Sequence, residues 1–359
     1  DTIVGAAYWD DGFSDEPLED LVARLPSETG PLPVLLVQGE GEPTAVTKSL
    51  SVRCRYCGQR NAVKEGYKNN TANCGRCKLP LSNEPHKKFA DLSKHAYIHP
   101  ADSKALAALK AVPGIDSALK KLLEVTGESA IRVTFMASAV KVTPKQCPDL
   151  HAKLQIVCTT LGVPMPDLFI QQNPVVNAFT GGVEKPIIVL HSSLIERLNE
   201  EETLAVIAHE VGHIHAEHVL YLTAANLILA IATIPLASLP IAVILKEVLT
   251  ATMRGALLAW MRRAELSCDR AALLVVQDPH VVGRTMMKLA GGTFASKINY
   301  DLFLEQAREF QKNYDENKLD KFWADIINAG LSHPFPIWRV SEILKWVESG
   351  EYEEVLKNN

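Results

Sequence analysis

Cysteine is scarce in this sequence, and its distribution excludes a fold built on disulfides. The chain has 7 cysteines among 359 residues. Four of them stand in two closely spaced pairs, whereas Cys147, Cys158 and Cys268 are scattered along the chain. Three leftover thiols cannot all pair with one another, which is typical of a reducing compartment. We therefore predict a cytoplasmic location.

The sequence also lacks any internal repeat. Its apolar fraction of 47% is ample for a hydrophobic core. A chain of 359 residues has room for two domains, or for one large domain and a small module.

Charge is unevenly distributed along the chain. Residues 1–50 carry ten acidic and two basic side chains, whereas residues 51–89 carry nine basic and two acidic ones. The basic stretch has one aromatic residue between its first two cysteines, Tyr56, and no series of aromatics on which bases would stack. We predict no nucleic-acid partner: the basic surface is either solvated or faces the acidic N-terminal stretch.

The most informative motif is His209-Glu210-Val211-Gly212-His213. On a helix the two histidines are four residues apart, so both imidazoles project from one face. This spacing suits two ligands of a tetrahedral zinc, with Glu210 beside the open position. Asn199, followed by three glutamates, predicts the start of the helix, and Gly212 permits close approach of another segment.

A third protein ligand is needed for a catalytic zinc that keeps one water. Glu265 is suited to this role because a ligand from a second helix closes the site from another direction. Glu217, four residues after His213, is the alternative. His215 and His218 do not share the face of the motif histidines, so we predict that they are solvated or hydrogen-bonded polar residues.

Four ordered motifs within residues 101–351 resemble the gluzincin metallopeptidases that include HtpX and the CAAX prenyl-protein endopeptidases. The motifs are Asn177-Ala178-Phe179, His209-Glu210-x-x-His213, Glu265-x-x-x-Asp269 and His333-Pro334. The family usually has His-Pro-Pro at the last motif, whereas this chain has His333-Pro334-Phe335-Pro336.

The resemblance implies a zincin-like domain and a role for each motif residue. His209, His213 and Glu265 would bind zinc, Glu210 would be the general base, and Asp269 would orient a zinc-ligand histidine. Asn177 and His333 would lie near the substrate carbonyl and donate hydrogen bonds to the developing oxyanion. As alternatives for the last two, Asn-Ala-Phe is a turn and His-Pro is a loop corner.

A second metal site is predicted near the front of the chain. Cys54, Cys57, Cys74 and Cys77 form two C-x₂-C pairs at the distance typical of a closed, structural Cys₄ zinc site. The segment has little hydrophobic content and needs metal to hold a fold. Two disulfides would require an oxidising compartment, and a redox dithiol would not need four cysteines.

The 27-residue stretch Val219–Leu245 contains no charged residue. A single membrane crossing would place His213 and Glu265 on opposite sides, and two crossings need about 40 apolar residues. We therefore predict a short apolar hairpin around Pro235 and Pro240. Burial or self-association is favoured over contact with a membrane surface, and membrane association stays open.

Together these patterns predict an α+β protein, mostly helical, with a small sheet. We predict an acidic N-terminal segment (1–50), a zinc ribbon (51–83), a linker (84–100) and a zinc metallopeptidase domain (101–359). The function predicted is a zinc-dependent endopeptidase acting on polypeptides, with one catalytic and one structural zinc. The alternative is a catalytically silent scaffold recruited through its ribbon. The run Pro186–Leu190 predicts a strand, which either pairs with substrate at a sheet edge or is an ordinary packed strand.

Overall fold

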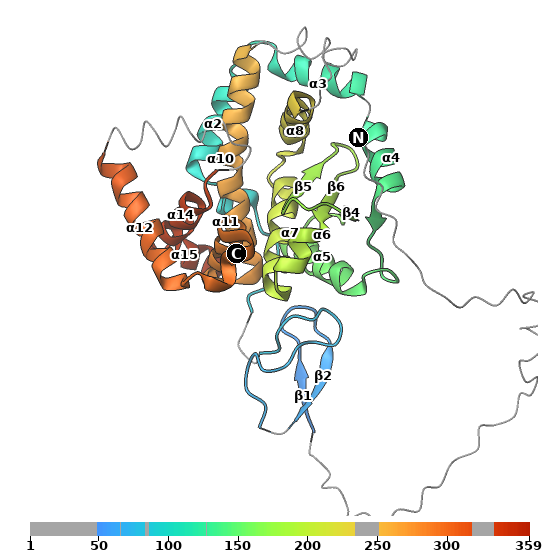
Figure 1. Ribbon diagram of the computed structural model, residues 1–359, viewed down its shortest axis with the longest axis vertical. Coiled ribbons are helices and arrows are strands. Elements are labelled where there is room, and N and C mark those ends of the chain that lie inside the picture. The colour runs from blue at the N-terminus through green and yellow to red at the C-terminus, as the bar shows by residue number, and fades with distance from the viewer. Residues whose placement is uncertain (1–48, 65, 83–85, 127, 234–250, 318–333) are drawn as a thin grey trace, which may run out of the picture. The chain divides into compact units, whose positions relative to one another are not determined.

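The computed structural model describes residues 49–64, 66–82, 86–126, 128–233, 251–317 and 334–359. All of them belong to one compact unit, Thr47–Asn359. The fold is α+β and mostly helical, with two small sheets (Figure 1), as predicted. The division into acidic segment, ribbon, linker and peptidase domain stays a prediction.

Helices lie before, within and after the part of the sequence that forms a small central sheet. They are α2 (Pro100–Lys110), α3 (Ile115–Thr126), α4 (Glu128–Ser138), α5 (Pro148–Leu161), α6 (Ser192–Arg197), α7 (Glu200–His215), α8 (Val219–Thr233), α10 (Ala251–Val276), α11 (Pro279–Gly291), α12 (Tyr300–Glu316), α14 (Pro336–Glu348) and α15 (Glu351–Asn358). Two 3-10 turns, η1 (Lys94–Ala96) and η2 (Gly292–Lys297), complete the described helical elements.

The central sheet is formed by four strands in the order β3-β4-β6-β5. Their bounds are β3 (Val140–Lys141), β4 (Asp167–Gln171), β5 (Ala178–Gly181) and β6 (Ile187–His191). β6 runs parallel to β4 and antiparallel to β5. The predicted strand is therefore the inner strand β6, whose residues are all buried. Among the described strands, β5 rather than β6 lies at the edge beside α7.

Helix α7 begins at the residue that the sequence indicates. The Asn199 side chain accepts a hydrogen bond from the Glu202 backbone N–H (2.9 Å), and the Glu202 carboxylate accepts one from the Asn199 N–H (2.8 Å). This reciprocal capping satisfies two backbone donors. At the other end, Glu217 adopts φ 60°, and the His218 N–H donates to the His213 carbonyl (2.9 Å). This Schellman turn ends the helix and folds His218 back beneath it.

Gly212 allows α7 and α10 to pack at close range (Figure 1). A Cβ at this position would lie 2.9 Å from the Ala271 Cβ and 3.4 Å from the Cys268 Cα. Any larger residue would force the two helices apart. The glycine in the middle of the motif therefore brings the face of α10 that carries Glu265 and Asp269 up to the motif histidines.

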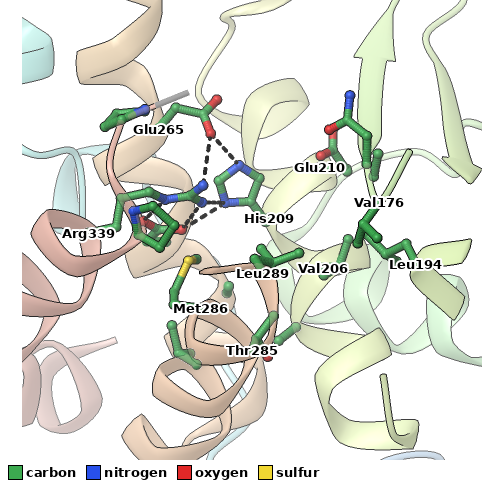
Figure 2. A pocket seen from close by; sticks show the side chains of 18 of the residues that line it. Val176, Leu194, Val206, His209, Glu210, Glu265, Thr285, Met286, Leu289 and Arg339 are labelled. Atoms are coloured by element: carbon green, nitrogen blue, oxygen red, sulfur yellow. Dashed lines mark hydrogen bonds and ion pairs between the residues drawn. The ribbon is translucent and has the colours of Figure 1, made fainter. Parts of the chain in front are cut away.

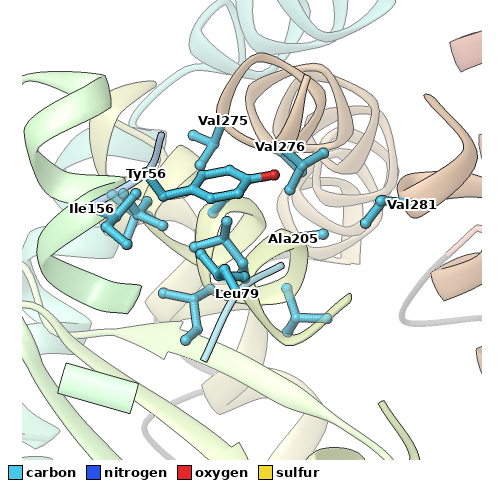
Figure 3. Close-up of a cluster of buried hydrophobic side chains, with 14 of the residues drawn as sticks. Tyr56, Leu79, Ile156, Ala205, Val275, Val276 and Val281 are labelled. Atoms are coloured by element: carbon cyan, nitrogen blue, oxygen red, sulfur yellow. The ribbon is translucent and has the colours of Figure 1, made fainter. Parts of the chain in front are cut away.

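The cysteine-containing segment of residues 49–82 packs into the same core as α5, α7 and α10 (Figure 3). Strands β1 (Ser49–Arg53) and β2 (Arg60–Lys64) form an antiparallel pair. Tyr56 and Leu79 from this segment lie among Ile156, Ala205 and Val275 in one buried cluster. The segment predicted to be a zinc ribbon is thus continuous with the hydrophobic core rather than attached by a few surface contacts.

The segment that follows the ribbon, predicted to be a linker, also contacts the core. Leu92 and Tyr97 are buried. Gln277, just after α10, holds the segment through two hydrogen bonds of 2.8 Å to the backbone of Lys87. The His99 side chain then caps α2 by accepting from the Ala101 N–H (3.1 Å).

The first part of the uncharged stretch is the helix α8, whose residues Leu222, Ala224 and Ala225 are buried in a cluster with Trp260 and Leu119. This agrees with the prediction of burial for that part. Residues 234–245, with the predicted bend at the prolines, lie outside the described residues. In the part of the chain that the structure describes, no helix is both long and apolar enough to cross a membrane.

Candidate catalytic metal centre and zinc ribbon

Glu265 on α10 lies close to both motif histidines of α7; Figure 2 shows its contact with His209. Glu265 Oε2 lies 3.4 Å from His209 Nε2, and Glu265 Oε1 lies 3.3 Å from His213 Nε2. All three side chains are buried. One carboxylate therefore faces the Nε2 atoms of both imidazoles, although it comes from a helix that begins 36 residues after α7 ends.

This donor set fits a zinc ion. Ligand atoms at about 2.1 Å from a tetrahedral zinc lie about 3.4 Å from one another, and the two nitrogen–oxygen separations are 3.4 and 3.3 Å. Two imidazole nitrogens and one carboxylate are also a ligand set known for catalytic zinc, which keeps a fourth position for water. Both separations between Glu265 and the histidines are therefore those expected when the carboxylate and each imidazole bind one ion.

Two other residues compete for the role of third ligand. Glu217 points away: its side chain is 78% exposed and pairs with Lys94 at 2.6 Å. Cys268 also lies within reach of both motif histidines, and its sulfur is 3.8 Å from the Nδ1 of His218. Burial raises the pKa of the Cys268 thiol well above its usual range, which disfavours the thiolate that a metal requires. Glu265 is the better candidate.

Asp269, one turn after Glu265 on α10, contacts the opposite nitrogen of the first histidine. Its Oδ1 lies 3.0 Å from His209 Nδ1. Burial opposes protonation of His209, but the charge of Glu265 and the hydrogen bonds to Asp269 and Glu265 outweigh it and raise its pKa to about 10. In the absence of metal this imidazole holds a proton strongly, so metal and proton compete for the site.

Arg339 on α14 is a member of the site that the sequence did not indicate. Its guanidinium donates to both oxygens of Asp269 (2.8 and 2.5 Å) and lies 3.4 Å from Glu265 Oε2 (Figure 2). Burial opposes its charge, but the two carboxylates outweigh this and raise the pKa of Arg339. A buried cation thus balances two buried anions.

Replacing Arg339 with methionine should lower the free energy of unfolding by about 3–5 kcal/mol, because Asp269 and Glu265 lose their buried counterion. The measurement is chemical unfolding of the full chain. Arg308→Met is the matched control, since Arg308 forms an exposed ion pair with Glu348 (3.2 Å) and should change stability by less than about 1 kcal/mol. Equal effects of the two variants would contradict the pairing role of Arg339.

Glu210 is oriented by the edge strand β5. The Thr180 hydroxyl lies 2.7 Å from Glu210 Oε2 and 3.1 Å from the Glu210 carbonyl oxygen. Thr180 is fully buried. The hydroxyl donates to an acceptor-only carboxylate, which fixes one oxygen of Glu210 and leaves the other to interact with water or substrate. Nothing in the sequence near Thr180 indicates this contact.

A cavity of about 240 Å³ opens beside the candidate metal position. His209, Glu210 and Glu265 form its polar wall, and Asn177 is also among the lining residues. The remaining wall is largely apolar; the labelled members in Figure 2 are Val176, Leu194, Val206, Met286 and Leu289. Pro334 lines the cavity, but His333 itself lies outside the described residues.

The four ribbon cysteines converge on a second point. Cys54 Sγ lies 3.7 Å from Cys77 Sγ, and Cys57 Sγ lies 3.6 Å from Cys74 Sγ. Sulfurs bound to a tetrahedral zinc at about 2.3 Å lie about 3.8 Å apart, so the cluster fits that ion. All four are free thiols, and hydrogen bonds from Cys54 and Cys77 lower the pKa of Cys57.

The two cysteine pairs are held by matching turns. The Gly58 N–H donates to the Cys54 carbonyl (2.9 Å), and the Lys78 N–H donates to the Cys74 carbonyl (3.0 Å). Gly58 and Lys78 both have positive φ, at 75° and 62°. Each turn presents two thiols to the same centre, which is the arrangement expected of a structural zinc ribbon.

Comparison with known proteins places the chain in a family of metallopeptidases. The model of Peptidase family M48 matches residues 144–347, more than half of the chain. The chain therefore belongs to this family. No solved structure matches it.

Individual relatives agree with this assignment. The plastoglobule-localized metallopeptidase 48, chloroplastic, of Arabidopsis thaliana is 39% identical over 306 residues, covering 84% of this chain and 86% of the relative. A protease HtpX homolog of Ligilactobacillus salivarius is 36% identical over 92 residues, covering 25% of this chain and 31% of the relative. Protease HtpX homolog 2 of Methanosarcina mazei is 24% identical over 186 residues, covering 44% and 60%. The similarity to the Arabidopsis protein extends over most of both chains, whereas the HtpX homologs share a smaller part.

Proposed function

We propose that this protein is a zinc-dependent endopeptidase in which His209, His213 and Glu265 hold the catalytic zinc. The observation that supports this most directly is the position of the Glu265 carboxylate, 3.4 and 3.3 Å from the Nε2 atoms of the two motif histidines. Bound there, zinc would polarise a peptide carbonyl and lower the pKa of a bound water. Four ribbon cysteines would hold the second, structural zinc.

In this proposal Glu210 is the general base. It takes a proton from the attacking water and returns it to the leaving amine nitrogen, so that the peptide bond is hydrolysed. The hydrogen bond from Thr180 holds the Glu210 carboxylate in place between these two transfers. Asn177 and His333 are proposed to donate hydrogen bonds to the developing oxyanion.

The substrate is proposed to be an extended polypeptide lying along β5, the edge strand beside Glu210. Val206, Met286 and Leu289 give the adjoining cavity an apolar wall. This wall suits an apolar side chain next to the cleaved bond. A peptide library should therefore show cleavage beside leucine or phenylalanine in preference to charged residues.

A metal-exchange experiment tests the zinc proposal. The purified full chain should contain two zincs and cleave casein, a chelator such as 1,10-phenanthroline should abolish cleavage, and added zinc should restore it. Both sites require deprotonated ligands, so the protein must be reloaded near neutral pH. Cleavage that survives complete removal of metal would overturn the proposal.

The compartment and the surface partners are proposed as well. The Arabidopsis relative is named plastoglobule-localized and chloroplastic, and we propose this location for the present chain in place of the cytoplasm. We further propose that the uncharged stretch 219–245, apart from the α8 residues buried against Leu119 and Trp260, provides self-association or contact with a lipid surface. Cell fractionation with an antibody against the protein tests the location, and flotation with lipid vesicles tests the contact.

A further inference from the structure

We propose that His218 and Asp102 position the zinc ligand His213 by fixing which of its two ring nitrogens carries the proton. The inference rests on the proposed function, because it concerns a ligand of the catalytic zinc. Neither residue lines the cavity beside the metal position. They act from behind the ligand, as a buried chain of hydrogen bonds that runs from α7 to the first turn of α2.

The chain of contacts starts at the nitrogen of His213 that faces away from Glu265. His213 Nδ1 lies 3.3 Å from His218 Nδ1. His218 Nε2 lies 3.0 Å from Asp102 Oδ2. All three side chains are at most 2% exposed, so water does not compete for these contacts. The Schellman turn at Glu217 is what returns His218 to a position beneath His213.

Asp102 is held as an acceptor by two further donors. The Ser267 hydroxyl donates to Oδ2 at 2.6 Å, and the Trp260 indole N–H donates to Oδ1 at 3.0 Å. With His218, three donors surround one carboxylate. Burial opposes ionisation of Asp102, but these hydrogen bonds outweigh it and lower its pKa.

With a metal rather than a proton on His213 Nε2, as the proposed function requires, these contacts fit the following arrangement of protons. The carboxylate of Asp102 only accepts, so His218 Nε2 carries a proton. A His218 ring with its one proton on Nε2 has a lone pair on Nδ1, which accepts from His213 Nδ1–H at 3.3 Å. With its proton on Nδ1, His213 has its lone pair on Nε2, the nitrogen that faces Glu265 and the metal position. The buried chain therefore prepares the correct nitrogen of His213 for zinc.

Asp102→Asn should disturb this arrangement while keeping the size of the side chain. The indole of Trp260 can only donate, so the amide oxygen must face it and the amide NH₂ must face His218. His218 Nε2 would then have to accept and its Nδ1 would carry the proton. His213 Nδ1 would become the acceptor, and its proton would move to Nε2, where it blocks metal binding.

The expected result is a 10–100-fold loss of metal affinity at the histidine site. Cobalt(II) is the probe, because its absorption distinguishes a nitrogen–oxygen site from the four-sulfur ribbon site. The double variant Asp102→Asn/Trp260→Phe should bind cobalt more tightly than Asp102→Asn alone, since loss of the indole donor lets the amide turn its oxygen toward His218. If Asp102→Asn acts only by disrupting the core, the double variant should instead bind cobalt more weakly than Asp102→Asn alone.

Tyr221→Phe is the control for general destabilisation. Tyr221 lies in the buried cluster that contains Trp260, and its hydroxyl donates to Asp116 at 2.8 Å. Its removal should lower the unfolding temperature without changing cobalt affinity at the histidine site. Unchanged affinity in Asp102→Asn, or absence of recovery in the double variant, would overturn the positioning role.

The wild-type protein provides a test that does not depend on folding of a variant. Nitrogen-15 NMR of the labelled, zinc-loaded full chain should show His218 protonated at Nε2 and not at Nδ1, and His213 protonated at Nδ1. A proton on His218 Nδ1 would overturn the inference. If wild type takes up cobalt at the histidine site but lacks these tautomers, the positioning role fails alone; if it takes up cobalt only at the ribbon, the zinc proposal fails as well.

Discussion

Glu210→Gln should lower the rate of peptide hydrolysis by about 10²–10⁴-fold, the range typical of a general base, while zinc stays bound. Glutamine has the shape of glutamate, and its amide oxygen can still accept the hydrogen bond from Thr180. The amide cannot take up the proton of the attacking water. The variant is compared with wild type by kcat/KM on a fluorogenic peptide and by zinc content.

Glu217→Gln is the matched control, because Glu217 is four residues beyond His213 just as His213 is four beyond His209. Its exposed side chain pairs with Lys94 rather than with the motif histidines, so hydrolysis and zinc content should stay at the wild-type level. If the Glu210 variant cleaves as fast as wild type with zinc bound, the endopeptidase proposal is wrong. The scaffold alternative would then be favoured.

The functional residues of α7 could be predicted because their role depends on the spacing of residues that are close together in the sequence. Histidines four residues apart share a helical face whatever packs around them, and Asn199 marks the helix start through contacts within three residues. Glu265 and Asp269 could be predicted from the resemblance to a family and from the need for a third ligand. In both helices the paired residues are four apart, about one helical turn, and this spacing is visible in a single sequence.

Arg339, Thr180 and His218 could not be assigned in this way. Arg339 and Asp269 are 70 residues apart, and Thr180 and Glu210 are 30 apart. Their contacts depend on how α14 and β5 pack against α7 and α10, which no local pattern records. His218 is close to His213 in sequence, but its position beneath that residue depends on the positive φ of Glu217, a conformation unusual for glutamate.

The hydrophobic core also includes more of the chain than the sequence indicated. Residues 51–100 have sparse apolar side chains, so they predict a separate module and a linker. In the structure Tyr56, Leu79 and Leu81 are buried together with residues of the peptidase helices. A few large side chains at the right places are enough to join two segments, and composition alone does not show where they point.

The double variant Cys74→Ser/Cys77→Ser should lose one of two zincs and unfold at a temperature at least about 10 °C lower than wild type. A structural zinc of this kind supplies about 10–16 kcal/mol of binding free energy in isolated fingers. Without it the ribbon cannot hold Leu79 and Leu81 in the shared core, and each buried leucine contributes about 1.5–3 kcal/mol. Each kcal/mol lost from the free energy of unfolding lowers the unfolding temperature by about 2–4 °C. A loss of several kcal/mol from the core therefore gives the expected decrease.

Zinc analysis and calorimetry of the full chain measure these two effects, and Cys147→Ser is the control. Cys147 is a free, half-buried cysteine that precedes α5 and lies outside the ribbon, so its replacement should leave both zincs and the unfolding temperature unchanged. A double variant that loses one zinc yet unfolds like wild type would show that the ribbon does not stabilise the peptidase core. The cysteine segment contacts the core through Ala205 and Val275, which lie on the two helices that carry the proposed zinc ligands. We therefore also expect weaker metal binding at the histidine site in the double variant.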